Sequence, residues 1–413
     1  MQKAVIIGAG HGGVQAATSL REEGFEGKIT LISDENTLPY QKPPLSKGFL
    51  NGKQTIENLL FRNALYYAEN DIDLVLNETI THIDIAKKTV FAQSGDQFDY
   101  DSLILATGAR NRPLNTDATS RSNREGVVFS NIVYLRHLGD AQNTKSQLGI
   151  SKKVVVIGGG FIGLEVAAAA VELGKKVTVI EAQERLMNRV LPPVVSDVFL
   201  KKHIEHGVDV LLNAKVVKIN QSTEGCVSGI QLGDNQEIIA DLLVIGIGVL
   251  PNSELAEAAG LACVNGITVN EYLQTSDPSV FAIGDCAAYY NVYAERKMRV
   301  ESVQNAVDQA KTVAKNIVGV PTKFHAVPWF WTNQYDLKLQ MAGIAIDFDQ
   351  IILRGSVDAQ KFSAFYFKNK KLIGVDSLNR AADHLAARKL LQAGVSPTKE
   401  QIEDMDFKLG SLY

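Results

Sequence analysis

The chain has few cysteines and no strong excess of charge. Its 413 residues include three cysteines, an odd number with no C-x-x-C pair. This pattern argues against a disulfide framework, an iron–sulfur cluster and a zinc site built on paired cysteines. We therefore expect no bound metal and a reducing, cytoplasmic setting. The formal net charge of −4 argues against nucleic acid as the main partner.

Long hydrophobic runs are also missing. No apolar segment approaches the ~20 residues that a bilayer span needs, so we expect no membrane partner. The chain opens with MQKAVIIGAG, which leaves no room for a signal peptide before the first strand. Hydrophobic residues (46%) and charged residues (21%) are in globular proportion. At this length, the composition predicts two or three globular domains.

One pattern occurs twice: a strand, a glycine-rich turn, a helix, a second strand and an acid. The first copy runs from AVII through GAGHGG to Asp34, and the second from VVVIG through GGGFIG to Glu181. The glycines allow a tight turn and close approach to a pyrophosphate, and the acid accepts hydrogen bonds from a ribose. A single copy can be an ordinary glycine-rich loop, but the repeat predicts two dinucleotide sites. The glycines concerned are Gly8, Gly10, Gly12 and Gly13 in the first copy and Gly158, Gly160 and Gly163 in the second.

The residue pattern of the chain changes outside these two copies. The polar stretch 114–126 is typical of a crossing loop. SLILATGARNRP, ADLLVIGIGVLPN and SVFAIGDCA each predict a strand that runs into a turn. From about residue 326, the alternating runs LKLQMAGIA, QIILRGS, FSAFYFKN and KLIGVDSLN precede a helix-like RAADHLAARKLLQAG. This last section indicates a smaller α+β domain.

Seven motifs occur in a fixed order: GAGHGG, PYQKPPLSK, LILATGA, GGGFIGLE, TSDPSVFAIGDCA, VESVQNAVDQA and PWFWTNQYDLKLQMAG. In this order the chain resembles, from residue 2 to about 393, the FAD-dependent pyridine nucleotide reductases of the NADH–ferredoxin reductase branch, the putidaredoxin reductase and rhodocoxin reductase type. The resemblance implies an α/β fold with two Rossmann-like, glutathione-reductase-like domains, one inserted in the other. The implied boundaries are 1–115 and 249–325 for the FAD domain, 116–248 for the NAD domain and 326–413 for a C-terminal α+β domain.

The same resemblance assigns residues to FAD. It places Gly12 in the first turn, Asp34 on the adenosine ribose, Lys47 near the flavin, Ile80 at the adenine end, Arg136 close to the cofactor, Asp285 at the ribityl or phosphate region, Val303 beside the pyrimidine side and Trp331 on the flavin ring. Lys42 stands where relatives often carry arginine. A lysine contacts a phosphate only as a point charge, whereas an arginine can bind it with two hydrogen bonds. From the residues alone, Asp285 can instead cap a helix, Asp34 can cap a turn, and Trp329 and Trp331 can be core residues.

For the second nucleotide, Glu181 indicates a preference. A carboxylate at the end of the second strand repels the 2′-phosphate of NADPH, so we expect NADH. Arg189 and Gly248 are candidates for further contacts with this nucleotide, although Arg189 can also be a plain surface arginine.

The segment PYQKPPLSKGFL carries none of the cysteines that disulfide reductases of this superfamily place there. The resemblance therefore implies an enzyme whose flavin passes electrons singly to a two-iron two-sulfur ferredoxin, which serves a haem monooxygenase or a ring-hydroxylating dioxygenase. The oligomeric state is left open by the sequence, and we take a monomer as the default. Two alternatives remain: a reductase of rubredoxin or of a small molecule such as a quinone or monodehydroascorbate, and an interaction flavoprotein like apoptosis-inducing factor.

Two further predictions concern charged side chains. Glu165 lies in the apolar stretch GLEVAAAAV, where an unpaired buried carboxylate is costly, and relatives place the lysine of PPLSK against it. We therefore expect Lys47 and Glu165 to pair as catalytic residues, the alternative being that Glu165 faces solvent. For docking an acidic ferredoxin we expect Arg62, Arg296, Lys297, Arg299 and Lys311, with a basic segment 361–389 that has seven basic residues against two acids. Such residues can also form an ordinary solvated face.

Overall fold

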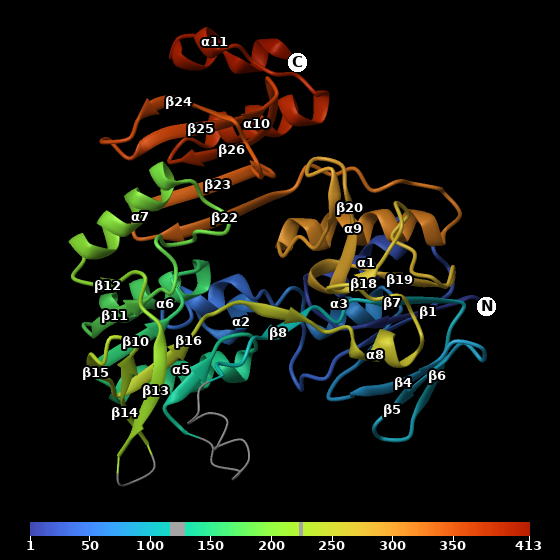
Figure 1. The fold of residues 1–413 in the computed structure, drawn as a ribbon. Helices are drawn as coiled ribbons and strands as arrows, with labels where there is room; N and C mark the ends of the chain where they lie inside the picture. Colours follow the sequence, from blue (N-terminus) through green and yellow to red (C-terminus); the bar gives the residue numbers. More distant parts are fainter. Residues whose placement is uncertain (116–128, 223–225) are drawn as a thin grey trace.

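The structure is a computed structural model that describes residues 1–115, 129–222 and 226–413 (Figure 1). Most of the predicted crossing loop at 114–126 lies outside the described residues. Three five-stranded sheets organise the described part of the chain, each in its own lobe. The first and second lobes lie side by side, and the third lies above the second (Figure 1).

The first sheet is parallel, with the strand order β19-β7-β1-β2-β3. Helix α1 (His11–Glu22) connects β1 to β2 and packs against α9 (Val303–Ile317). Both β1 and β2 are buried except at their first residue, as expected of a parallel sheet covered on both faces. The strands are β1 (Lys3–Ile7), β2 (Lys28–Ile32), β3 (Ile72–Val75), β7 (Ser102–Leu105) and β19 (Val280–Ala282).

The second sheet repeats this design with the order β12-β11-β10-β16-β9, again parallel. An antiparallel sheet of β13, β14 and β15 lies beside it. The strands are β9 (Ile132–Tyr134), β10 (Lys153–Ile157), β11 (Lys176–Ile180), β12 (Asp209–Leu211), β13 (Val216–Gln221), β14 (Val227–Leu232), β15 (Glu237–Ile239) and β16 (Leu242–Ile245). The helices are α5 (Leu138–Ile150), α6 (Phe161–Glu172) and α7 (Pro193–Glu205).

Short elements complete the first lobe. They form a hairpin sheet β4-β5-β6 and a second small sheet β18-β20-β21. Their bounds are η1 (Pro43–Ser46), α2 (Ile56–Leu59), α3 (Ala64–Glu69), β4 (Ile80–Asp84), β5 (Thr89–Ala92), β6 (Gln97–Asp99), α8 (Glu254–Ala258), β18 (Ile267–Thr268), η2 (Gly284–Cys286), β20 (Ala287–Asn291) and β21 (Arg296–Met298).

The third sheet is antiparallel, with the order β22-β23-β26-β25-β24, and it is buried on both faces. One face packs with residues of α7 and the other with α10, because alternate side chains of β25 enter two different cores. The elements are β22 (Trp329–Gln334), β23 (Leu337–Gly343), β24 (Gln350–Ser356), β25 (Lys361–Lys368), β26 (Lys371–Leu378), α10 (Ala381–Ala393), α11 (Lys399–Glu403) and η3 (Leu409–Leu412). Strand β22 is absent from the strands predicted by sequence alternation.

A two-stranded antiparallel ribbon joins the first and second lobes. Its strands, β8 (Ala109–Asn111) and β17 (Val249–Pro251), are where the chain passes from one lobe to the other and back. The predicted α/β architecture, with one dinucleotide lobe inserted in the other, is thereby confirmed, while the domain boundaries stay a prediction. None of the described helices is long and apolar enough to cross a membrane.

Candidate active site

Both glycine loops turn sharply where the strand passes into the helix. Gly8 and Gly158 have φ values of 104° and 107°, a region that L side chains rarely adopt. A Cβ on Gly13 would lie 1.8 Å from the carbonyl oxygen of Gly8, and one on Gly163 would lie 2.2 Å from that of Gly158. Helix and loop can therefore approach this closely only because these residues have no side chain.

The middle glycine of each loop instead faces open space. A Cβ on Gly10 would meet no atom within 4 Å, and one on Gly160 would meet only the carbonyl oxygen of Gly246, at 3.9 Å. The chain's own packing does not require glycine there. A bare backbone at a helix N-terminus is what close approach of a pyrophosphate requires, so both loops fit a dinucleotide. Gly12 differs, because its Cβ would press on Ile283 at 3.3 Å.

The two acids have different surroundings. Asp34 is exposed beyond β2 and accepts no hydrogen bond from the described residues, which leaves its carboxylate available to a ribose. Glu181 accepts hydrogen bonds from the backbone N–H groups of Gly159 and Gln183, both at 2.8 Å. These bonds fix the carboxylate at the second glycine loop, and each oxygen keeps a free lone pair for a ribose hydroxyl.

The sequence analysis missed a charged cluster next to Asp34. Glu35 Oε1 lies 3.1 Å from His137 Nδ1 and 3.5 Å from Lys42 Nζ, and Glu35 Oε2 accepts from the Tyr40 hydroxyl. Burial opposes ionisation of Glu35, but His137 and Lys42 outweigh it and lower its pKa to about 2. Lys42 is half-buried, and this partial burial lowers its pKa. Its predicted phosphate contact stays a prediction.

Two residues predicted at the FAD site meet each other. Arg136 and Asp285 form an ion pair with 2.9 Å between Nη2 and Oδ2. His11, also missed although it lies inside GAGHGG, faces this pair, and burial together with the charge of Lys42 lowers its pKa to about 4. His11 is therefore neutral at pH 7. The alternative role of Asp285 as a helix N-cap is wrong, because the cap of η2 is Ile283.

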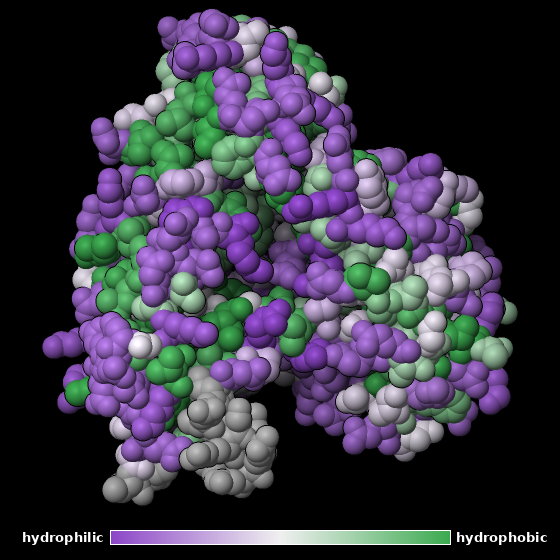
Figure 2. All heavy atoms as spheres, in the orientation of Figure 1, coloured by the Kyte–Doolittle hydropathy of each residue, from purple (hydrophilic) through white to green (hydrophobic). Residues whose placement is uncertain are grey.

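A pocket of about 350 Å³ brings together Lys47, Val303 and Trp331, the three residues that the family resemblance places beside the flavin. Apolar rings with a few polar groups are the usual lining of a site for a planar ligand. The other lining residues are His11, Gln41, Pro43, Pro44, Gln54, Phe61 and Asn333. The surface view shows that the molecule is hollowed between its lobes (Figure 2).

The predicted ion pair of Lys47 and Glu165 is present. Lys47 Nζ lies 2.8 Å from Glu165 Oε2, and the side chain of Glu165 is 5% exposed, so the alternative of a solvent-facing carboxylate is wrong. The hydroxyl groups of Ser46 and Thr332 donate to the same carboxylate. With three donors, the buried charge is well satisfied.

Of the two tryptophans and the remaining predicted contacts, only Trp331 lines the pocket. The Trp329 ring lies next to the Trp331 ring, with 5.4 Å between the ring centroids, and the Arg388 guanidinium lies over it. Ile80 opens β4 and packs partly buried against the core of the first lobe, outside the pocket. On the second lobe, Arg189 is exposed, and a Cβ on Gly248 would meet nothing within 4 Å.

The predicted docking residues divide into groups. Arg62 and Lys311 are exposed, the first beside the pocket residue Phe61 and the second on α9, the helix that begins with Val303. Arg296 and Lys297 are exposed on β21. Arg299 contradicts the prediction, because its side chain is only 9% exposed. Its guanidinium donates to the backbone carbonyl of Asp285 and pairs with Glu301, so it holds the fold together.

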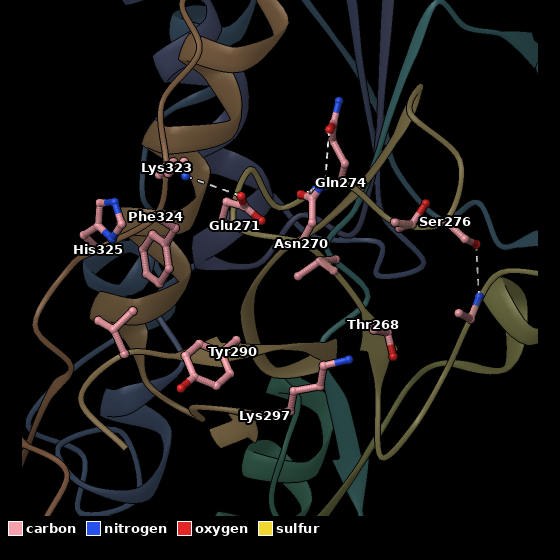
Figure 3. Close-up of a pocket in the computed structure, with 14 residues that line it drawn as sticks. Thr268, Asn270, Glu271, Gln274, Ser276, Tyr290, Lys297, Lys323, Phe324 and His325 are labelled. Carbon is pink, nitrogen blue, oxygen red and sulfur yellow. Dashed lines mark hydrogen bonds and ion pairs between the residues drawn. The ribbon is translucent and has the colours of Figure 1, made fainter. Parts of the chain in front are cut away.

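A second pocket, of about 620 Å³, lies on the first lobe beside β20 and β21 (Figure 3). Lys297 and Tyr290 lie on one side of it, and the ion pair of Lys323 with Glu271 lies on another. None of the residues predicted to hold FAD or NAD lines this pocket. It is therefore separate from the candidate active site.

Comparison with known proteins gives matches along most of the chain. The model of the pyridine nucleotide-disulphide oxidoreductase family matches residues 2–310, and that of the reductase C-terminal domain matches residues 329–413. Rhodocoxin reductase of Rhodococcus erythropolis is 46% identical over 98% of this chain and 93% of its own length. Rubredoxin-NAD(+) reductase of Pseudomonas putida is 40% identical over 91% of this chain and 95% of its own length. The solved structure of the covalent putidaredoxin reductase–putidaredoxin complex matches with a TM-score of 0.95 and 38% identity, covering 100% of this chain and 98% of that one.

Proposed function

Because the chain belongs to the pyridine nucleotide-disulphide oxidoreductase family, we propose that it is an FAD-containing, NADH-dependent ferredoxin reductase. The observation that carries this proposal is the pocket where Lys47, Val303 and Trp331 meet. None of the residues lining that pocket is a cysteine, so the protein offers no thiol beside the flavin to receive electrons. An external acceptor must do so.

Bound FAD supplies the redox chemistry, since it takes a hydride from NADH as two electrons and can release them one at a time. The chain binds and orients the reactants. The first glycine loop and Asp34 are the candidates to hold FAD, and the second loop with Glu181 to hold NADH. Lys47 would set a positive charge beside the ring, and Glu165 would fix that charge in place.

We further propose that the acceptor is a two-iron two-sulfur ferredoxin serving a haem monooxygenase or a ring-hydroxylating dioxygenase. The similarity to rhodocoxin reductase and to putidaredoxin reductase in its covalent complex with putidaredoxin supports a redox protein as partner. Three free cysteines support the cytoplasm as the setting, and the monomeric state stays a prediction.

Rubredoxin is a second candidate acceptor, because a rubredoxin reductase is 40% identical to this chain. Steady-state oxidation of NADH with cytochrome c as the final acceptor would separate the two. Turnover that depends on an added two-iron ferredoxin supports the proposal, and turnover that depends on rubredoxin instead selects the second candidate. Ferricyanide, which accepts electrons directly from reduced flavin, is the control for an active enzyme. Turnover with ferricyanide but with neither protein would contradict both assignments.

A further inference from the structure

A chain of hydrogen bonds leads from Glu165 into the protein, away from the pocket. Thr332 Oγ1 donates to Glu165 Oε1 at 2.7 Å, and Gln334 Nε2 donates to Thr332 Oγ1 at 3.3 Å. Gln334 Oε1 lies 2.9 Å from His203 Nε2, and His203 Nδ1 lies 3.3 Å from the hydroxyl of Tyr335. Buried side chains of β22 and α7 thus support a carboxylate on α6.

The alternation of β22 explains how one strand serves both sides. Trp331 and Asn333 line the pocket. Thr332 and Gln334, 0% and 1% exposed, point the opposite way, because successive side chains of a strand alternate between its faces. The strand therefore presents an aromatic wall to the pocket and a row of hydrogen-bonding groups to the helices behind it.

Every donor in this chain points toward Glu165. An ionised carboxylate only accepts, so the Thr332 hydroxyl hydrogen is committed to it and the Thr332 oxygen accepts from the Gln334 amide. The Gln334 oxygen then faces His203 and requires a hydrogen on Nε2. His203 is fully buried, and burial lowers its pKa, so it is neutral and its Nδ1 is left to accept from Tyr335. Hydrogen bonds aligned in one direction strengthen one another.

We propose that Thr332, Gln334 and His203 are positioning residues that hold the Glu165 carboxylate fixed, and through it hold Lys47 at the edge of the flavin pocket. This inference rests on the proposed function, because it requires FAD in that pocket and NADH as its reductant. Without the Thr332 donor, the buried carboxylate keeps only Ser46 and Lys47. Glu165 Oε1 would have lost the donor that the structure gives it, and a buried acceptor left unsatisfied is costly, so the carboxylate would turn to recover a partner and displace Lys47 with it.

The test compares Thr332→Val with Thr332→Ser in the FAD-bound enzyme. Valine keeps the shape and removes the donor, whereas serine keeps the donor. The rate of flavin reduction by NADH, measured by stopped-flow absorbance without any ferredoxin, should fall about tenfold in the valine variant, the effect of losing one hydrogen bond to a charged group. The serine variant should stay within about twofold of the unmodified enzyme. The midpoint potential of the flavin should shift in the valine variant alone.

Thr144→Val is the matched control. Thr144 is also fully buried, but its hydroxyl donates only to the backbone carbonyl of Asp140, so its loss should leave both readouts unchanged. Gln334→Leu breaks the chain one step further back and tests the inference even if Thr332→Val does not fold. We expect it to slow flavin reduction about threefold to tenfold.

Two outcomes would overturn the inference. One is a folded Thr332→Val or Gln334→Leu enzyme with unmodified rate and potential. The other is an equal loss in the valine and serine variants, which would reveal a packing effect. If NADH fails to reduce the flavin of the unmodified enzyme, the proposed function itself is wrong, and the two failures are thus distinguished.

Discussion

At the residue scale, Glu181 has the most direct consequence for nucleotide choice. Its carboxylate is fixed at the second glycine loop, where it would repel a 2′-phosphate. We expect Glu181→Arg to lower the ratio of kcat/KM for NADH to kcat/KM for NADPH by at least about tenfold, since one pair of like charges is replaced by an attraction. Glu181→Gln, which removes only the charge, should have a smaller effect. Equal use of NADH and NADPH by the unmodified enzyme would contradict this role of Glu181.

Asp376, buried in β26, predicts a pH-dependent stability. Burial raises its pKa to about 7, and its carboxylate accepts from the Tyr366 hydroxyl at 2.6 Å. The pKa of an unfolded aspartate is about 4, so between about pH 4 and pH 7 Asp376 is protonated in the folded chain but ionised in the unfolded chain. The proton that only the folded chain binds stabilises it, and this stabilisation is lost as pH rises through that window. Asp376→Asn removes the titrating carboxyl group and with it this pH dependence. The free energy of unfolding of this variant, relative to the unmodified protein, should therefore rise by about 3 kcal/mol from pH 5 to pH 8.

Urea unfolding at the two pH values, followed by circular dichroism, measures this difference. Tyr366→Phe serves as the control, because it leaves the carboxyl group in place and should keep the pH dependence. A difference between Asp376→Asn and the unmodified protein that is the same at both pH values would show that Asp376 does not titrate in this range.

At the scale of elements, the C-terminal segment depends on one side chain of β24. Arg354 is 4% exposed and donates to the backbone carbonyls of Ile402, Asp404, Met405 and Phe407. Arg354→Met would leave these carbonyls without their donor and the buried Asp383 carboxylate without one of its two arginines, at a cost of about 3 kcal/mol or more. We expect faster amide hydrogen exchange from residue 404 to the end of the chain, with β25 unchanged. Unaltered exchange in that segment would show that other contacts hold it.

At the scale of the whole molecule, the exposed cations predict where an acidic partner docks. Arg62 follows the pocket residue Phe61, and Lys311 lies on α9, which begins with the pocket residue Val303, whereas Arg296 and Lys297 lie beside the second pocket. We expect Arg62→Ala with Lys311→Ala to raise the KM for ferredoxin severalfold while leaving turnover with ferricyanide intact, because the charges act on encounter. The pair Arg296→Ala with Lys297→Ala, which removes the same charge elsewhere, should have less effect.

Salt provides an independent check of this steering. Ferredoxin reduction should slow as ionic strength rises from about 10 to 150 mM, since the screening length shortens severalfold. A rate that barely responds, or equal effects of the two double variants, would argue that these cations do not direct docking.

What the sequence predicted about the site depends on how local the signal is. The glycine loops and Glu181 lie on short segments with their own spacing, and Glu165 was marked by the apolar helix around it. Thr332 and His203 carry no such mark, because their roles appear only when β22 and α7 are brought beside α6. Arg299 was misjudged for the same reason: it follows two exposed cations in the chain, but its side chain turns inward to the carbonyl of Asp285.

The chain leaves the first lobe through β8 and returns to it through β17, so the second lobe is synthesised between two parts of the first. All strands of the second sheet are synthesised before β19, the strand that completes the first sheet beside β7. Since domains fold as units during synthesis, the lobe that starts second is the first to have its whole sheet. Until β19 emerges from the ribosome, β7 has an unpaired edge that can attract other strands. The nascent chain therefore exposes this edge of β7 from the time β7 leaves the ribosome until β19 does.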